Sequence, residues 1–211
     1  ASTVRIDGTV VEHADVEPVT LPRVVLLVNP TGAPRVTVKK REVGDLGPYV
    51  PGGRPYGELR VEQNATLILH SGTYYFERFV VHHHAHLILD LDEGPITVNI
   101  KEGLHIGAYV RMTLQGGDAG EVLFNVAGAG LNHQEPGEDE DEDSWALRDN
   151  HGHVDYTPSL SIRILNNTQF FGTIYAPQGK VRVGRKSQMR GAILARQVRL
   201  YNQVAFEGEV A

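Results

Sequence analysis

The stretch FVVHHHAHLIL (79–89) matches two others without a gap, LRVEQNATLIL (59–69) before it and LHIGAYVRMTL (104–114) after it. Apolar residues recur in fixed columns of this alignment. The columns are Val61, Val81 and Ile106; Ala65, Ala85 and Val110; Leu67, Leu87 and Met112; Leu69, Leu89 and Leu114. Each stretch is followed by a turn and a second short β-rich run, so the unit that repeats contains at least two strands.

The C-terminal part of the chain repeats as well, at offsets of 19 and 17 residues. Its columns are Ile162, Val181 and Val198; Ile164, Val183 and Leu200; Phe170, Met189 and Phe206; Gly172, Gly191 and Gly208; Ile174, Ile193 and Val210. Periods near 20 residues are typical of β-solenoids, in which no coil buries its apolar side chains until another coil stacks on it. Helix-type spacing of apolar residues is almost absent.

These patterns predict an all-β chain folded as a parallel β-helix (β-solenoid). In this fold, strands of successive coils lie ~4.8 Å apart and pair in parallel. The inward columns then form one continuous core. The alternative is a β-sandwich or jelly roll, which also consists of short strands. A sandwich has no reason to keep one apolar column through three successive segments, so the repeats favour the solenoid.

Two regions lack the repeat. Residues 1–55 contain strand patterns and are expected to form an irregular first coil, a cap, or a strand along the solenoid. Residues 56–211 are expected to form the β-helix domain, with a polar, acidic insertion at 127–159.

Composition excludes several functional classes. The chain has 211 residues, no cysteine and a net charge of −6, and the run Glu135–Asp143 carries seven carboxylates, more than that whole charge. The rest is nearly neutral, so no basic field favours nucleic acid. No apolar stretch is long enough to span a membrane. Without cysteine there are no disulfides and no thiolate sites.

Most of the chain from Tyr56 onward resembles a known family. The residues that carry the resemblance are GELRVEQNATLILHSGTYYFERFVV (57–81), HLILDLDEGPITVNIKEGLHIG (86–107) and FFGTIYAPQGKVRVGRKSQMRGAILARQVRL (170–200), with GTIYAP followed by GAILA as the most specific part. They are similar to bacterial extracellular right-handed β-helix domains of the choice-of-anchor, adhesin-like type, and more distantly to bactofilin-type polymer-forming proteins. The resemblance implies a right-handed parallel β-helix, a structural or adhesive role, and an extracellular or cell-surface location with the leader removed. It carries over no catalytic residue.

The histidine cluster is the first candidate site. His82, His84 and His86 alternate, and imidazole is a common ligand of zinc and copper. The alignment, however, places His82 to His84 at a turn and His86 between inward columns, and three such positions in an extended strand span ~13 Å. A solvated surface is the simpler interpretation, and a weak or intersubunit metal site is the alternative.

Two carboxylate groups are further candidates. The run Glu138–Asp143 offers oxygens suited to calcium but lacks the spacing of a preformed calcium loop, which favours a solvated loop. Asp90, Asp92 and Glu93 lie at a turn where a β-helix enzyme acting on polysaccharide could carry acid and base groups. Because Gly-Pro follows at once, an ordinary turn is the simpler interpretation.

A basic C-terminal surface is also expected, made of Arg182, Arg185, Lys186, Arg190, Arg196 and Arg199. Arg182 and Arg199 fall in one outward column, where like charges repel without an acidic partner. The surface either is solvated beside the acidic run or docks the acidic loop of another subunit.

The last coil leaves an open end, which predicts an assembly interface. Uncovered strands present unpaired N–H and C=O groups, and a head-to-tail contact that does not close makes a filament. The residues expected at this interface are Val198, Leu200, Val204, Phe206 and Val210. We therefore expect a non-catalytic extracellular structural protein, without cofactor, that self-assembles into filaments or a surface layer. The alternatives are a carbohydrate-binding surface adhesin and a polysaccharide-active enzyme.

Overall fold

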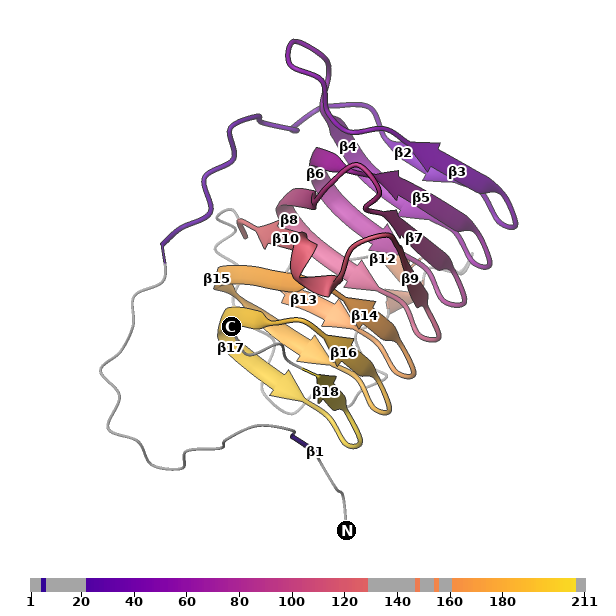
Figure 1. The fold of residues 1–211 in the computed structure, drawn as a ribbon, viewed down its shortest axis with the longest axis vertical. Coiled ribbons are helices and arrows are strands. Elements are labelled where there is room, and N and C mark those ends of the chain that lie inside the picture. Colours follow the sequence, from indigo (N-terminus) through magenta and orange to yellow (C-terminus); the bar gives the residue numbers. More distant parts are fainter. Residues whose placement is uncertain (1–4, 7–21, 129–146, 149–153, 156–160, 208–211) are drawn as a thin grey trace.

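The computed structural model describes residues 5–6, 22–128, 147–148, 154–155 and 161–207. These residues form strands stacked coil upon coil, as Figure 1 shows, so the prediction of an all-β parallel β-helix is confirmed. Every pairing between coils is parallel. Parallel strands of this kind require a long connection, which each coil supplies by winding once round the core.

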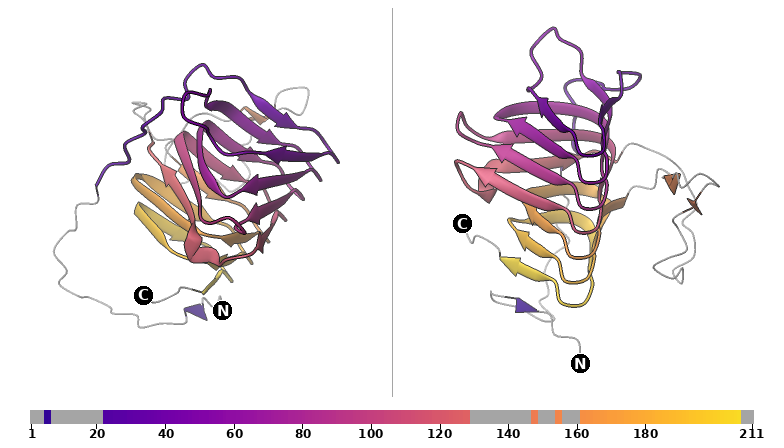
Figure 2. Two further views of the ribbon diagram at one scale, coloured as in Figure 1. Left: turned by 45° about the horizontal axis from the view of Figure 1, so that its top comes forward. Right: turned by 90° about the vertical axis from the view of Figure 1, so that its right-hand side faces the viewer.

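One wall of the solenoid is an eight-stranded sheet. Its strands are β2 (Val36–Val38), β4 (Tyr56–Val61), β6 (Gly72–Val81), β8 (Ile96–Ile106), β10 (Val122–Val126), β13 (Ser161–Ile164), β15 (Thr173–Val183) and β17 (Ile193–Leu200). The longest strands change register halfway, between Phe76 and Arg78 in β6. The shift divides this wall into two faces, and the views in Figure 2 show how the coils turn there.

A second wall consists of shorter strands. They are β3 (Val43–Leu46), β5 (Thr66–His70), β7 (His86–Asp90), β9 (Arg111–Gln115), β14 (Gln169–Phe171), β16 (Gln188–Arg190), β18 (Ala205–Glu207) and β1 (Arg5–Ile6). The Gln169 N–H donates to the Val110 carbonyl, so β14 follows β9 in the stack. The aligned repeats before and after the insertion therefore belong to one continuous solenoid.

Strand register places the aligned apolar residues directly above one another. Val61 pairs with Val81 and Val81 with Ile106, and all three are fully buried. In the C-terminal coils Ile162 pairs with Val181 in the same way. Because side chains alternate between the two sides of a strand, this register sends these stacked residues into the core. Phe76, Phe79, Phe124 and Phe170 form a chain of ring contacts through its centre.

One corner of each coil contains a residue with left-handed backbone. These residues are Arg41, Asn64, His84, Tyr109, Asn167, Lys186 and Gln203, with φ between 57° and 65°. This conformation turns the chain sharply, and after every corner except the first, at Arg41, the next residue is buried, as Ala65 and Ala85 are. Thr168 and Ser187 occupy the same inward position although they are polar. Their hydroxyls donate to the carbonyls of Gly107 and Leu165, which satisfies them inside the core.

A column of glycines opens the longest strands. Gly172 and Gly191 have φ of 128° and 133°, values that L side chains rarely adopt. A Cβ on Gly191 would lie 2.3 Å from the Gly172 carbonyl oxygen. The repeat of glycine in the sequence therefore reflects a close backbone approach between coils.

The insertion divides one coil at the point where the other long strands bend. β10 pairs with the first halves of β8 and β15, and β13 pairs with their second halves. The chain leaves this coil after Val126 and returns at Ser161, so the interruption does not disturb the core. Within it the structure describes only β11 (Leu147–Arg148) and β12 (Val154–Asp155), which pair in antiparallel fashion. Just before β10 lies η1 (Ala119–Glu121), a short 3₁₀ turn capped by Asp118.

The N-terminal residues contribute in three places. β2 and β3 form the first coil, and residues 22–35 run along the outside of the solenoid, where the Tyr175 hydroxyl donates to the Pro22 carbonyl. β1 pairs in parallel with β18, the second-wall strand of the last coil. The N-terminal segment thus contacts both ends of the solenoid.

The stacked core predicts that two substitutions by alanine, one in the core and one at the surface, lower the free energy of unfolding by different amounts. Leu87→Ala removes a fully buried side chain between Leu67 and Met112, and we expect it to lower the free energy of unfolding by about 2–5 kcal/mol. Val43→Ala, at a side chain that is 68% exposed, should change it by less than about 0.5 kcal/mol. Urea unfolding followed by circular dichroism measures both. Equal effects would contradict the stacked core.

Candidate functional site

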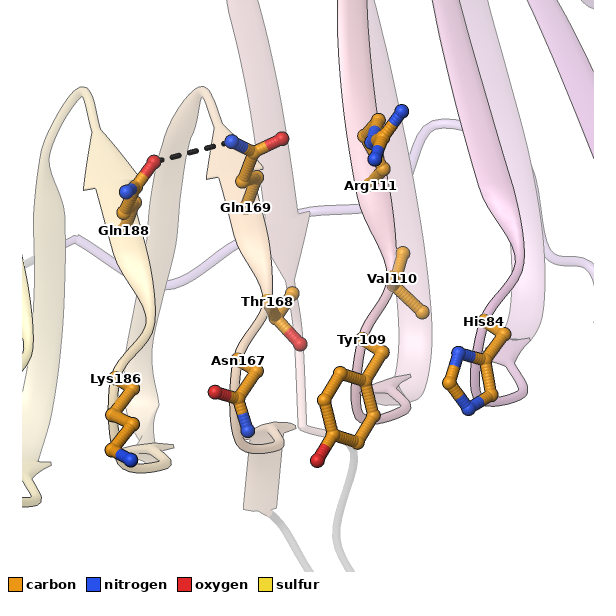
Figure 3. Close-up of a pocket in the computed structure, with 9 residues that line it drawn as sticks. All are labelled: His84, Tyr109, Val110, Arg111, Asn167, Thr168, Gln169, Lys186 and Gln188. Atoms are coloured by element: carbon orange, nitrogen blue, oxygen red, sulfur yellow. Dashed lines mark hydrogen bonds between the residues drawn. The ribbon is translucent and has the colours of Figure 1, made fainter.

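A shallow groove runs along the corner where the left-handed residues lie. It has a volume of about 620 Å³, opens to solvent and crosses four coils. Figure 3 shows its lining as two rows of side chains on either side of a narrow floor. The groove runs parallel to the solenoid axis, because each row takes one residue from each successive coil.

The first row consists of His84, Tyr109, Asn167 and Lys186, all in the left-handed conformation. Their backbone N–H groups do not face the groove as free donors. Each donates to a carbonyl of the following coil, as His84 does to Ala108 at 3.0 Å. The His84 and Tyr109 rings lie nearly parallel, 4.9 Å apart, and Tyr109 remains 55% exposed. The corner thus presents its side chains in a row held rigidly by backbone bonds.

The second row consists of Arg111, Gln169 and Gln188, the first residues of β9, β14 and β16. The Gln169 side-chain amide donates to the Oε1 atom of the Gln188 side chain at 3.2 Å. Between the rows the floor is formed by Val110 and Thr168, which are buried. The lining therefore combines amides, an aromatic ring and two cations.

The electrostatic character of the groove is positive. Arg111 and Lys186 line it, whereas no carboxylate does. Among the described residues neither cation has an ion-pair partner. Such a surface can hold an extended anionic or polar ligand by charge-assisted hydrogen bonds.

The histidines singled out in the sequence do not gather. His84 lines the groove, while the His86 ring bonds the Thr113 hydroxyl at 2.8 Å. His82 is partly buried, and burial lowers the pKa of both His82 and His86. Within the described ranges, no three His, Cys, Asp or Glu side chains come close enough to hold a metal ion. A site shared between subunits stays a prediction.

Of the carboxylates at the turn after β7, Asp90 has structural partners. Asp90 accepts the backbone N–H of Asp92 at 3.1 Å and lies 2.9 Å from the Nδ1 of His70. The other ring nitrogen of His70 lies 2.8 Å from Asp45. The three residues come from β3, β5 and β7, so a histidine lies between two carboxylates across successive coils. The hydrogen bond to Asp90 and then that to Asp45 raise the pKa of His70.

The arginine column follows the predicted register. Arg163 pairs with Arg182 and Arg182 with Arg199, beside His105. Burial, followed by the charge of Arg163, lowers the pKa of His105 to about 3. Whether this surface docks an acidic loop stays a prediction, because Glu138–Asp143 lies outside the described residues.

The residues expected at the assembly interface have different environments. Val198 on β17 is 42% exposed, and Leu200 is partly buried. Val204 is buried in the corner of the last coil, and Phe206 pairs with Ile6 of β1. Val210 lies outside the described residues.

Sequence reasoning missed the groove because its rows cross the insertion. Tyr109 and Asn167 are neighbours in the stack, yet 58 residues separate them in the chain. A signal was present, since Asn64 and Asn167 belong to similar stretches and asparagine favours left-handed turns. The pairing of His70 with Asp45 and Asp90 likewise depends on the register of three strands.

The fold and this groove define a β-solenoid protein with a polar, cationic corner. A family described as a domain of unknown function (DUF7305) matches residues 45–210, and the chain belongs to that family. Searches of curated proteins and of solved structures find no match. In the part of the chain that the structure describes, no helix has the length and apolarity needed to cross a bilayer.

The pKa of His70 predicts a specific dependence of stability on pH. A raised folded-state pKa adds stability that is complete below the unfolded value of 6.5 and is lost as pH rises through the folded value. The stability difference between the wild type and His70→Gln, measured by urea unfolding, should therefore shrink as pH rises from below 6.5 into the alkaline range. Comparison with a variant is needed because other histidines act in the opposite direction.

His83→Gln is the matched control. Burial lowers the pKa of His83, so its contribution should grow as pH rises. The stability difference between the wild type and His70→Gln could instead stay constant with pH, or grow as that for His83→Gln does. Either result would show that the contacts with Asp90 and Asp45 do not stabilise the charged ring.

Proposed function

We propose that this chain is a non-catalytic structural protein of the cell exterior that assembles with further copies of itself through the ends of its solenoid. The extracellular setting is part of the proposal because the resemblance to surface β-helix domains implies it. The structural role is supported by Asp90, whose bonds to His70 and to the Asp92 N–H are those of a turn that joins coils.

One inward column carries the argument for assembly. Ile162 and Val181 in this column are fully buried, whereas Val198, the next member, is 42% exposed. Val198 is exposed because, among the described residues, no further strand stacks on the outer edge of β17. Among the described residues its strand β17 pairs only with β15, so one edge of an eight-residue strand has no partner there. Covering that edge with another strand would bury apolar surface and satisfy its backbone groups.

The opposite end of the solenoid offers a matching edge. Within the described part of the chain β2 pairs only with β4, on the same wall that β17 closes at the other end. A second copy placed in line with the first would bring β2 next to β17 with the strands parallel. Because this contact joins different surfaces of the two copies, it propagates into a filament rather than closing a dimer.

The second wall is covered differently at the β17 end. β1 pairs with β18 at Arg5–Ala205 and Ile6–Phe206, within the same chain. The proposed contact therefore depends on β17, and β1 limits how much of the last coil is available.

A charge placed at the end of the solenoid should oppose assembly. Val198→Lys would put an ammonium group at the contact without a partner, and we expect the concentration needed for assembly to rise at least about tenfold. Light scattering over a concentration series and negative-stain electron microscopy measure this. Val25→Lys, at a residue 77% exposed on the segment beside the solenoid, is the matched control and should assemble like the wild type. Wild-type protein that stays monodisperse at every concentration would refute the proposal.

A further inference from the structure

The corner groove lies on the flank of the solenoid, away from the strand edges that the proposed assembly uses. Its two rows run along the axis, with one side chain per coil in each row. The spacing between successive side chains is therefore that of stacked strands, ~4.8 Å. This spacing is comparable to the length of one sugar unit in an extended polysaccharide. Successive sugar units along such a chain could therefore contact successive coils.

The charges of the groove select for an anion. Arg111 belongs to the second row and Lys186 to the first, so the two cations lie on opposite sides of the floor. Neither has an ion-pair partner among the described residues, and the lining contains no carboxylate. A chain that carries carboxylates at intervals would meet one cation on each side. Arginine binds a carboxylate through two parallel hydrogen bonds, which adds geometric selectivity.

The remaining side chains suit hydroxyl groups. Asn167, Gln169 and Gln188 each have an amide that donates and an oxygen that accepts, and a sugar hydroxyl also does both. Tyr109 adds a ring between His84 and Asn167, and although the ring stacks on His84 it is 55% exposed, so the apolar face of a sugar ring can pack against its exposed part. A uronic acid polymer carries hydroxyl groups for the amides, a sugar ring for the aromatic side chain and carboxylates for the cations.

A peptide is a poorer fit to the same groove. Peptides that lie along a β-structure gain affinity by pairing with a free strand edge. The corner has no such edge, because the N–H groups of His84, Tyr109 and Asn167 already donate to the next coil. A peptide backbone lying here would meet only side chains, and its own amides would go largely unpaired.

We propose that the corner groove binds an anionic polysaccharide chain along the solenoid axis, with Arg111 and Lys186 holding its carboxylates and Tyr109 contacting a sugar ring. The proposal is independent of self-assembly, because it rests on a different surface. A filament of stacked solenoids would extend the groove from one copy to the next, but one copy already carries the site.

The test is isothermal titration calorimetry of the full chain at low ionic strength. The ligands are oligogalacturonate of defined length, a neutral cello-oligosaccharide of the same length, and oligoglutamate with the same number of carboxylates. We expect the oligogalacturonate to bind most tightly and its affinity to fall as salt is added. The double variant Arg111→Gln/Lys186→Gln should weaken that binding at least about tenfold.

Two further variants distinguish the contribution of the groove's charges to binding from that of the Tyr109 ring. Lys39→Gln/Arg54→Gln removes the same charge from exposed positions outside the groove and should leave binding unchanged. Tyr109→Asn removes the ring but keeps the turn, because asparagine holds the same conformation at Asn64 and Asn167, and it should weaken binding. Circular dichroism establishes that each variant is folded.

Several results would overturn the proposal. They are no binding of oligogalacturonate, equal or tighter binding of the neutral oligosaccharide, and equal or tighter binding of oligoglutamate, which would identify an acidic peptide as the ligand. Equal affinity of the groove double variant and the control double variant would also overturn it, because the charge effect would then be nonspecific.

Discussion

Parallel pairing of each coil with the next is the constraint on which the rest of this structure depends. It fixes every residue above its counterpart, so an apolar residue at one position of a coil requires apolar residues above and below it. The column of Val61, Val81 and Ile106, fully buried throughout, shows the result. No coil buries these side chains alone, so each coil depends for its stability on the coils stacked against it. The left-handed corner residues allow this, because they turn the chain, and in four of them, from His84 to Lys186, the N–H group also bonds to the next coil.

The same constraint organises the polar outside of the solenoid. The register that stacks apolar residues in the core also stacks polar side chains on the outside. Whether neighbouring polar side chains attract or repel each other then depends on their charges and hydrogen-bonding groups. Asp45, His70 and Asp90 are complementary and bond across three coils. Asn125 and Asn99 form a similar contact through their amides, at 3.1 Å. Where cations meet instead, as in the column of Arg163, Arg182 and Arg199, the stack concentrates one sign of charge.

Two kinds of surface stand out among the described residues, and they have different physical origins. One is the outer edge of β17, which no described strand covers and where Val198 is 42% exposed. The corner groove exists because the residues beside the left-handed turns project outward in two rows. Assembly would use backbone edges and apolar surface, whereas the groove offers side-chain charge and hydrogen bonds. A protein with both would combine self-association with attachment to a polymer, in keeping with a structural or adhesive role.

The sequence alone determined the architecture, because residues that point into the core must be apolar in every coil. This requirement makes apolar residues recur at regular intervals, which can be recognised without knowing any contact. The aligned columns on both sides of the insertion have the register that the alignment predicted. It also located the turn positions of His82 to His84. Only the tertiary structure decided which outward residues become neighbours across the insertion, as Tyr109 and Asn167 do, and which charges pair, as His70 does with Asp45 and Asp90. Outward positions tolerate many residue types, so, apart from columns such as that of Arg182 and Arg199, they show little periodicity in the sequence, and their contacts are known only when the coils are stacked.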